Sequence, residues 1–357
     1  MNVLHVITGL GIGGAELSLV QIASGLKQRG LIQSVVSLGR SNELRPALDE
    51  KGIAVTELNI SNVWSAPLAL WRLVQIIRTT QPRVIQGWMY HGDIAAALAH
   101  WLARNKVGRR LFWGLRASNM DDGRYGWVIR MASWLSPSPD VIVANSLRGA
   151  QEHVRFGYRP RRLEVVANGV DAGRFRPDPR ARQAVRAELG ISENAFVAIL
   201  VARVDRMKDH PTFLEAIEQN PNVVGLLVGK DTEGLSLPPN VRALGVRHDV
   251  ERLYAAADAV VSSSAFGEGF SNAIAEGMSA GLVPIATDVG DSASIVGTTG
   301  RVVPPRDCAA LASAIAAEAA ASVDERAARA NAARRRILDQ YTVEKAVSAF
   351  ERLYRAV

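Results

Sequence analysis

Short apolar runs alternate with longer amphipathic stretches along the 357 residues of the chain. Runs of strand length occur at 3–7, 33–38, 84–88, 110–115, 141–144 and 163–167 in the first half, and at 196–201, 223–228, 241–244, 259–262 and 283–286 in the second. Helical patterns separate them. Because strand–helix alternation places helices on both faces of a parallel sheet, the pattern predicts an α/β fold.

A break in this rhythm divides the chain near its middle. Asn168-Gly169-Val170-Asp171 is followed by RFRPDP at 174–179, where glycine and two prolines interrupt regular structure. The chain is also too long for one ordinary core. We therefore expect two Rossmann-like domains joined near residue 170.

The charge of the chain narrows the classes of partner. A formal net charge of +7 suggests an anionic ligand, nucleic acid or an acidic membrane surface, or else only an arginine-rich composition. A nucleic-acid or polyanion-binding protein would interleave cations with aromatic residues, whereas the candidate cations here stand singly at strand ends. We expect no nucleic-acid partner, and we expect the arginine-rich segment 328–336 to be a solvated helix face.

Cysteine content and hydropathy indicate the compartment. The single cysteine, Cys308, has no internal disulfide partner, which fits a reducing cytoplasm. The chain enters a strand almost at once without a secretory leader, and no run of 18 uncharged apolar residues occurs. We expect a cytoplasmic protein that is at most peripheral at the inner face of the membrane, with no metal cluster.

A glycine-rich turn, GLGIGGAE at 9–16, follows the first predicted strand and opens a helix. Its spacing matches the dinucleotide fingerprint, in which a pyrophosphate lies at a helix N-terminus. An NAD site needs a carboxylate at the end of the second strand, but that strand ends in Gly39-Arg40-Ser41. Two alternatives remain open: an NADP site, in which Arg40 binds the 2′-phosphate, and a turn whose glycines serve only packing.

Polar residues follow the predicted strands of both halves. In open parallel sheets the ligand lies beyond the carboxyl ends of the strands, so these residues predict a largely cationic rim on each domain and a cleft between them. They are 11–14, His91, Arg116, Ser118, Asn119 and Ser146 in the first half, and Arg203, Lys208, Gly229, Lys230, Glu268 and Asp288 in the second.

Two cations in the second half form a candidate diphosphate clamp. Arg203 and Lys208 lie between a strand and a helix that starts near Asp209 with Pro211 in its first turn. Arginine grips oxygens with two donors and lysine acts as a point charge. Two ordinary surface cations on a solvated loop are the alternative, and His210 belongs to the helix start.

Two carboxylates, Glu268 and Glu276, flank the start of the next helix. Ser271 or Asn272 is a plausible N-cap, so the free amides there face whatever anion binds. Glu276 could accept hydrogen bonds from a ribose diol, with Glu268 nearer the transferred group. A hydrolase acid/base pair is the alternative, but it leaves the neighbouring amides and cations unexplained.

Several motifs together point to a family. They are GGAE at 13–16, NGVD at 168–171, the pair Arg203 and Lys208, EGFSNAIAE at 268–276 and GLVPIATDVG at 281–290. In this order and spacing the chain resembles the family 4 retaining glycosyltransferases of GT-B fold over nearly its whole length. WMYHGD at 88–93 and WGLRASN at 113–119 look like the branch that builds bacterial surface polysaccharides.

The resemblance implies a domain for each substrate. An acceptor-binding domain would span 1–168, a nucleotide-sugar domain 169–342, and a terminal helix at 343–357 would cross back to the first domain. It implies a UDP-sugar donor, a glycan or polyprenyl-linked acceptor, and no metal or other cofactor. The implied donor residues are Gly13, Gly14, Arg203, Lys208, Gly229, Lys230, Val246, Arg247, Glu268, Phe270, Ser271, Asn272 and Glu276.

The resemblance also implies residues for the acceptor and the reacting centre. His91 would lie near that centre, where a packing or capping histidine is the alternative. Arg203 and Lys208 would hold the diphosphate, and Glu268 would meet the sugar and the distal phosphate. The acceptor candidates are Arg116, Ser118, Asn119 and Ser146. The short segment between 227 and 246 departs from the family, because a helix often found there has no room.

The chemistry expected from this resemblance is sugar transfer with retention, by front-face attack without an enzymic nucleophile. The alternatives are a nucleotide-sugar epimerase of the same fold, for which the sequence singles out no base, and a non-enzymatic polyanion-binding protein.

One helical segment, RYGWVIRMASWL at 124–135, carries tryptophans beside arginines. It could lie on an anionic membrane and present a lipid-linked acceptor. A core-facing amphipathic helix, with Trp127, Met131 and Trp134 inward, is the commoner explanation.

Overall fold

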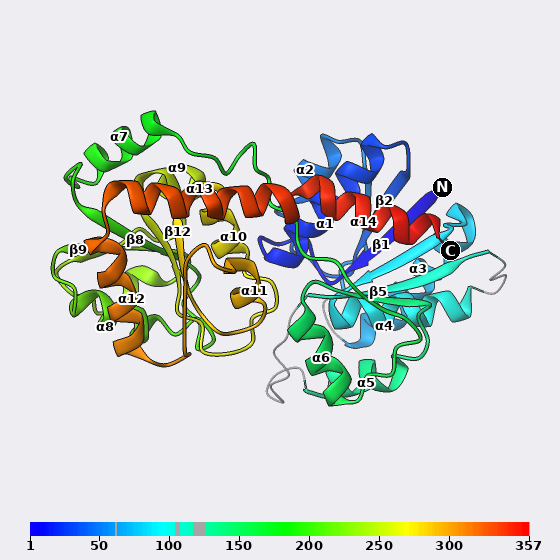
Figure 1. Ribbon diagram of the computed structural model, residues 1–357. Coiled ribbons are helices and arrows are strands. Elements are labelled where there is room, and N and C mark those ends of the chain that lie inside the picture. Colours follow the sequence, from blue (N-terminus) through cyan, green and yellow to red (C-terminus); the bar gives the residue numbers. More distant parts are fainter. Residues whose placement is uncertain (61–62, 104–107, 117–125, 357) are drawn as a thin grey trace. The chain divides into compact units, whose positions relative to one another are not determined.

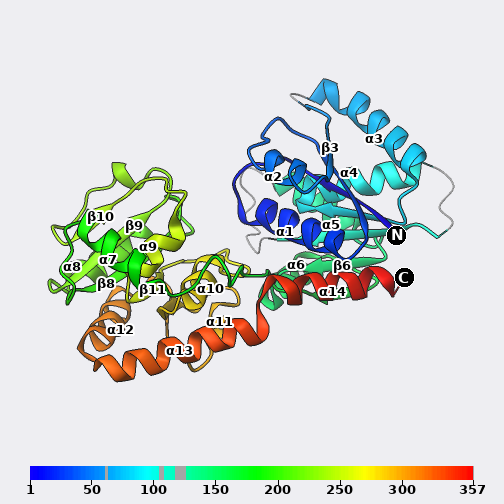
Figure 2. The ribbon, with the colours of Figure 1, turned by 90° about the horizontal axis from the view of Figure 1, so that it is seen from above.

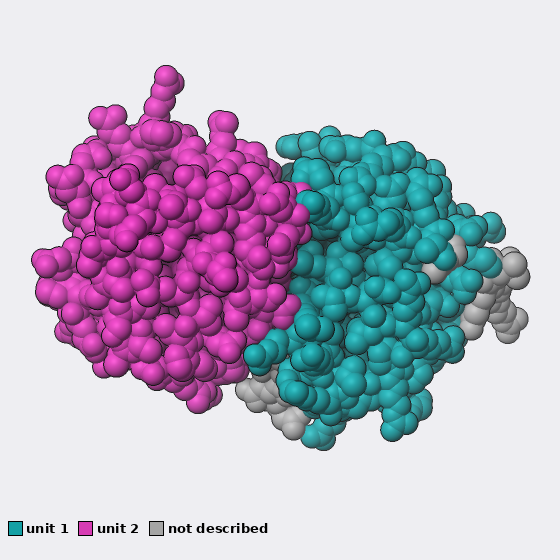
Figure 3. Space-filling view, in the orientation of Figure 1, with its two compact units in different colours: residues 1–169, 343–357 teal, residues 170–342 magenta. Residues whose placement is uncertain are grey.

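A computed structural model describes residues 1–60, 63–103, 108–116 and 126–356. The chain divides into two compact units (Figure 3). Unit 1 comprises residues 1–169 and 343–357, and unit 2 comprises residues 170–342. Unit 1 therefore contains both the first half of the chain and its C-terminal end.

Unit 1 is built on a seven-stranded parallel sheet in the order β3-β2-β1-β4-β5-β6-β7. Central strands such as β4 and β6 are buried along their whole length, as expected where helices cover both faces. The strands are β1 (Asn2–Ile7), β2 (Ile32–Ser37), β3 (Ala54–Glu57), β4 (Val84–Trp88), β5 (Arg110–Leu115), β6 (Val141–Ala144) and β7 (Leu163–Val165).

Helices cover both faces of this sheet (Figures 1 and 2). Val3 and Ile7 of β1 pack with α1 and α14, while Leu4 and Val6 pack with α3, α4 and α5, as the two-residue period of a strand requires. The helical elements of unit 1 are α1 (Gly14–Gln28), α2 (Arg45–Asp49), η1 (Val63–Ser65), α3 (Ala66–Thr80), α4 (Met89–Leu102), α5 (Gly126–Leu135), α6 (Leu147–Phe156) and α14 (Val343–Arg355).

The C-terminal helix α14 is part of the core of unit 1. It lies along α1 (Figure 1), where a side chain at Gly25 would collide with Val347. Phe350 stacks on Trp88 with ring centroids 6.0 Å apart, and the Tyr354 hydroxyl donates to Gln86 Oε1 over 3.0 Å. These contacts attach the end of the chain to the sheet formed by its beginning.

Helix α5 differs from the expectation of inward-facing tryptophans. Its buried side chains are Val128, Ile129, Ala132 and Leu135, whereas Trp127 is 66% and Trp134 79% exposed. The core-facing explanation is therefore wrong for both tryptophans, because a second apolar stripe on the same helix supplies the packing.

Unit 2 holds a six-stranded parallel sheet in the order β10-β9-β8-β11-β12-β13. Its strands are β8 (Phe196–Val201), β9 (Val223–Val228), β10 (Val241–Ala243), β11 (Ala259–Ser262), β12 (Val283–Thr287) and β13 (Arg301–Val303). The predicted α/β class with two parallel sheets is confirmed, although β3 and β13 were not predicted.

Helices again cover the sheet of unit 2, with α8 and α12 packed together on one face through Phe213, Ile217, Leu311 and Ile315. Among the described residues a short 3-10 turn, η2, follows β9 where the longer helix has no room. The helical elements are α7 (Pro179–Glu188), α8 (His210–Glu218), η2 (Thr232–Gly234), α9 (Val250–Ala256), α10 (Asn272–Ser279), α11 (Ser292–Val296), α12 (Cys308–Ala320) and α13 (Val323–Gln340).

Helix α13 corrects the expectation of a solvated arginine face. Arg329 forms an ion pair with the buried Glu318, and its guanidinium group donates to that carboxylate over 2.8 Å. Arg334 donates to the carbonyl group of Phe175, and Arg336 to that of Ile295. These arginines attach α13 to the rest of unit 2.

Candidate functional site

In unit 2 the loops that leave β8, β9, β11 and β12 are joined by backbone hydrogen bonds at the carboxyl edge of the sheet. The Ala265 amide donates to Met207 O over 2.8 Å, the Val204 amide to Lys230 O over 2.9 Å, and the Asp291 amide to Gly269 O over 3.0 Å. We call this continuous surface, formed by residues 202–208, 229–231, 264–272 and 288–291, the unit 2 rim.

Asp205 shapes the loop that carries the two predicted cations. Its carboxylate accepts the Met207 amide over 2.9 Å and pairs with Arg203 Nη2 over 3.1 Å. Although partial burial opposes ionisation, these hydrogen bonds and the charges of Arg203 and Lys208 lower the pKa of Asp205. The Arg203 side chain remains 65% exposed, so it can reach an incoming anion.

Lys208 and Glu268 form an ion pair across the rim, sixty residues apart in sequence. Ser264 Oγ donates to the same carboxylate oxygen of Glu268 over 2.7 Å. Glu268 is only 8% exposed. The ion pair and the serine therefore hold the carboxylate in one place beside the ammonium group.

The start of α10 completes this side of the rim. Ser271 is the N-cap residue, as predicted, although within the described part of the chain its side chain makes no capping bond. Phe270 is buried against Tyr341, with ring centroids 5.5 Å apart. The helix therefore begins at a fixed place, and its first amide groups, which no helix can satisfy internally, point outward from the N-terminus.

Glu276 lies one turn inside α10 in a low-dielectric environment. Burial raises the pKa of Glu276 to about 7, against the opposing charge of Arg174 and a hydrogen bond from Tyr254. Arg174 also pairs with Glu251 over 2.8 Å. The carboxyl group can thus change its charge near neutral pH.

Glycines allow the backbone to approach closely at two points of the rim. A side chain at Gly229, where φ is 145°, would collide with the carbonyl oxygen of Ala202. A side chain at Gly290, where φ is 60°, would collide with that of Glu268. Glycine is therefore required both beside Lys230 and at the end of the GLVPIATDVG motif.

The residues expected to face a nucleobase lie after β10. Val246 is 59% exposed, which leaves an apolar surface beside the rim. The Arg247 guanidinium pairs with Asp249 through two bonds of 2.8 Å, and this pair raises the pKa of Arg247. Arg247 is therefore held by its neighbour, and its contact with a base stays a prediction.

In unit 1 the predicted residues lie at the starts of helices. Gly13 is the N-cap of α1 and Gly14 its first residue. His91 is in the first turn of α4, half-buried, and burial lowers its pKa, so the imidazole is neutral at pH 7. A neutral imidazole can both donate and accept a hydrogen bond.

The predicted acceptor residues have different surroundings. The Arg116 guanidinium lies over the Trp88 ring at 4.6 Å and donates to Asn168 Oδ1 over 3.0 Å, and burial lowers its pKa to about 10. Ser146 is fully buried and caps α6 by accepting the Gly149 amide. Ser118 and Asn119 lie outside the described residues. The capping bond gives Ser146 a structural role, and the acceptor-binding roles of all four residues stay predictions.

Sequence reasoning missed the residues that hold the rim in place. Asp205 and Ser264 position the cations and Glu268, while Tyr254 and Arg174 surround Glu276. Only Asp205 carried a local signal, an acid two residues after Arg203. Ser264 is four residues from Glu268, whereas Tyr254 and Arg174 reach Glu276 from more distant positions in the sequence.

Two family models match large parts of the chain. The model for Glycosyltransferase Family 4 matches residues 12–174, and that for Glycosyl transferases group 1 matches residues 195–319. The chain belongs to glycosyltransferase family 4. This assignment favours a transferase over the NADP-dependent alternative for the turn at 9–16.

Similar curated proteins are glycosyltransferases too. The D-inositol 3-phosphate glycosyltransferase of Streptomyces coelicolor is 26% identical over 359 residues, covering 84% of this chain and 78% of that protein. The protein of the same name from Geodermatophilus obscurus is 34% identical over 206 residues, but the match covers only 50% of this chain and 45% of that relative. The lipopolysaccharide core biosynthesis glycosyltransferase LpsD of Rhizobium meliloti is 27% identical over 300 residues, covering 80% and 78%.

Solved structures agree on the architecture. HepE of Anabaena, crystallised with UDP-glucose, superimposes with a TM-score of 0.87 at 22% identity over all of both chains. This glycosyltransferase therefore has the GT-B fold of two Rossmann-like domains, as predicted. Among its described helices, none is long and apolar enough to cross a bilayer.

Proposed function

We propose that this glycosyltransferase moves a sugar from a UDP-sugar to a hydroxyl group of a glycan or polyprenyl-linked acceptor in surface-polysaccharide synthesis, with retention at the anomeric carbon. The observation that carries the proposal is the unit 2 rim, which brings Arg203, Lys208, Glu268 and the N-terminus of α10 together at one sheet edge. HepE was crystallised with UDP and with UDP-glucose, and LpsD is named for lipopolysaccharide core synthesis. Both support the donor and acceptor classes.

The charges of the rim suit a departing nucleoside diphosphate. Arg203 is exposed enough to grip phosphate oxygens, and Lys208 adds a second positive charge beside the start of α10. Negative charge grows on the diphosphate as the bond to the sugar breaks, so fixed donors stabilise the transition state more than the ground state. Glu268 and the amides of 270–272 would meet the sugar and the distal phosphate.

Retention follows from attack on the face that the diphosphate leaves. The acceptor oxygen bonds to the anomeric carbon as the carbon–phosphate oxygen bond breaks, and the acceptor proton passes to the departing phosphate. Glu268 is already held by Lys208 and Ser264, which suits a hydrogen-bonding role better than nucleophilic attack. A covalent glycosyl-enzyme trapped at Glu268 or Glu276 contradicts this mechanism.

A thermal-shift panel of UDP, GDP, ADP and NADPH tests the donor. A ligand at about 100 times its Kd adds about 2.7 kcal/mol to the folded state, so UDP should raise the Tm while NADPH does not. Arg203→Ala should abolish most of the UDP shift. Arg206→Ala, which removes another exposed cation of the same loop, should preserve it. Stabilisation by NADPH alone contradicts the transferase site.

The titration of Glu276 predicts the pH dependence of UDP binding. The folded pKa, about 7, exceeds the ordinary 4.5, so the folded protein holds a proton between these values and this group's contribution to stability falls as pH rises through them. The ionised carboxylate is the stronger acceptor for ribose hydroxyls. We therefore expect UDP affinity to rise between pH 6 and pH 8.

Isothermal titration calorimetry of the wild type and Glu276→Gln at pH 6, 7 and 8 measures this effect. The β-phosphate of UDP titrates in both experiments, so the difference between the proteins isolates Glu276. The rise should be smaller in the variant. Parallel profiles for the two proteins mean that Glu276 does not contact the ribose.

A further inference from the structure

The tryptophans of this chain have an uneven distribution. All seven lie in unit 1, where Trp88 and Trp113 are fully buried. The other five are exposed, at 91%, 58%, 41%, 66% and 79% for Trp64, Trp71, Trp101, Trp127 and Trp134. Large apolar side chains gathered on one surface of a protein mark an interaction site.

The exposed tryptophans lie on or beside the layer formed by α3, α4 and α5, which covers one face of the sheet (Figure 2). On α5 the outward stripe is Trp127, Arg130 and Trp134, at the spacing of one helix face, while Met131 beside them is partly buried. On α3 the exposed positions include Leu68, Trp71, Arg72 and Arg78, and Trp101 lies in the last turn of α4. We call the outer side of this layer the tryptophan face.

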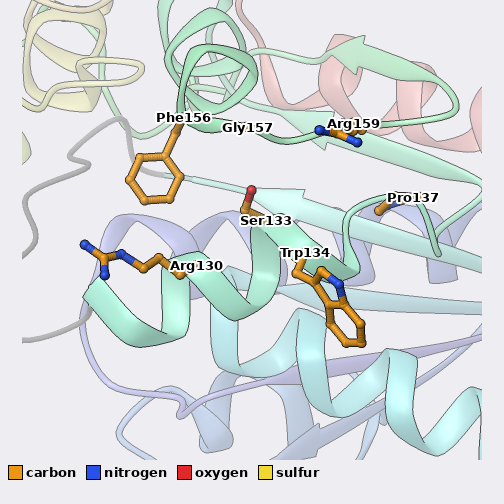
Figure 4. Close-up of a pocket in the computed structure, with 7 residues that line it drawn as sticks. All are labelled: Arg130, Ser133, Trp134, Pro137, Phe156, Gly157 and Arg159. Atoms are coloured by element: carbon orange, nitrogen blue, oxygen red, sulfur yellow. The ribbon is translucent and has the colours of Figure 1, made fainter.

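Two hollows indent the tryptophan face, and each combines aromatic rings with guanidinium groups. The first, of about 680 Å³, places Trp134 and Arg130 of α5 near Phe156 and Arg159 (Figure 4). The second, of about 650 Å³, includes Trp71, Arg78 and Trp101. This chemistry matches the headgroup region of a bilayer, where aromatic rings and cationic groups lie side by side.

The charge of the chain is concentrated in the same unit. Unit 1 contains 23 Lys and Arg against 13 Asp and Glu, whereas unit 2 contains 19 against 22. Arginine-rich composition alone does not explain this difference. Among the described residues of 58–139, which include α3, α4 and α5, seven cations stand against one acid, Asp93, which is buried.

We propose that the tryptophan face binds the surface of an anionic lipid bilayer. The tryptophan rings would enter the interface while the arginines contact lipid phosphates. The rest of each helix packs in the core of unit 1, so the surface is formed before binding. This interaction is independent of the donor site in unit 2.

Co-sedimentation with phosphatidylcholine vesicles, with and without phosphatidylglycerol, tests the proposal. Binding should require the anionic lipid and weaken as salt increases. Trp127→Ser combined with Trp134→Ser, and separately Trp71→Ser, should each reduce binding at least tenfold. Val323→Ser, at a 72% exposed apolar position of unit 2, is the matched control and should bind as the wild type does.

A second measurement needs no variant. Brominated lipids should quench the tryptophan fluorescence of the wild type, because five of seven indoles lie on the contacting surface. Three results overturn the proposal: equal binding to both vesicle types, no binding, and binding that the tryptophan variants leave unchanged. A dimer in sedimentation velocity that the same variants convert to monomer also overturns it, because a second copy then covers the face. The UDP-induced thermal shift should persist in these variants, so failure here is distinct from failure of the donor assignment.

Discussion

Replacing Lys208 by alanine is expected to lower kcat/KM for the UDP-sugar by about 10²- to 10³-fold, as is typical when one fixed group that stabilises transition-state charge is removed. The ammonium group of Lys208 contributes positive charge to the unit 2 rim and neutralises Glu268. Its loss leaves an unpaired carboxylate, 8% exposed, where a diphosphate must bind. The effect therefore combines lost attraction with new repulsion.

Release of UDP from UDP-glucose, UDP-galactose and UDP-N-acetylglucosamine measures this effect, with a glycan and a polyprenyl-linked acceptor tested separately. Arg206→Ala supplies the matched control, since it removes a cation from the same loop and should change the rate little. Combining Lys208→Ala with Glu268→Gln separates the two causes, because the neutral amide removes the repulsion and should restore part of the donor affinity. A Lys208→Ala enzyme with unchanged kcat/KM contradicts the diphosphate clamp.

Strands buried on both faces are the easiest to predict, although the edge strands β7 and β10 were predicted as well. Residues of β4, β6 and β11 are buried throughout, so they stand out as continuous apolar runs. The strands β3 and β13 lie at sheet edges, and β3 alternates between exposed and half-buried positions over only four residues. Such short edge strands lack an apolar run, and pattern alone does not detect them.

The face of a helix that packs inward was harder to predict than the spacing of its apolar residues. The tryptophans of α5 have helical spacing, but Val128, Ile129, Ala132 and Leu135 share that spacing on the opposite side. A helix with two apolar stripes does not reveal which one packs inward. On α13 the arginines look like a solvated face, although Arg329 pairs with Glu318 of the preceding helix. Tertiary partners decide both cases.

The same difference holds for the site, where single residues could be predicted from the sequence but their contacts with distant residues could not. The sequence predicted individual rim residues, because each follows a strand. It did not predict that Lys208 pairs with Glu268 or that Tyr254 lies against Glu276, since these contacts join separate loops and helices. Charge at the rim could therefore be foreseen, but its pairing required the fold.

Replacing Arg186 by alanine is expected to cost about 3–5 kcal/mol of folding free energy, the typical result of breaking a buried ion pair. Arg186 is fully buried in unit 2. Its guanidinium group donates to Asp258 Oδ2 over 2.8 Å and to the carbonyl groups of four residues, Ala256, Ser192, Glu193 and Ala195. Alanine would remove all five of these hydrogen bonds, although Asp258 would keep its bonds from Arg182 and from the Val197 amide.

Urea unfolding followed by two signals measures where this stability is lost. All seven tryptophans lie in unit 1, so their fluorescence follows unit 1, while far-ultraviolet circular dichroism follows both units. Arg186→Ala should shift the dichroism transition to lower urea and leave the fluorescence transition in place.

Arg182→Ala is the control. Arg182 donates to the same Asp258, but its side chain is 31% exposed, so the substitution should lower the free energy of unfolding by about 1 kcal/mol. Equal losses for the two variants would mean that the five hydrogen bonds of the buried Arg186 contribute no more than the bonds of the partly exposed Arg182. A shift of both signals together would mean that the units unfold as one cooperative structure.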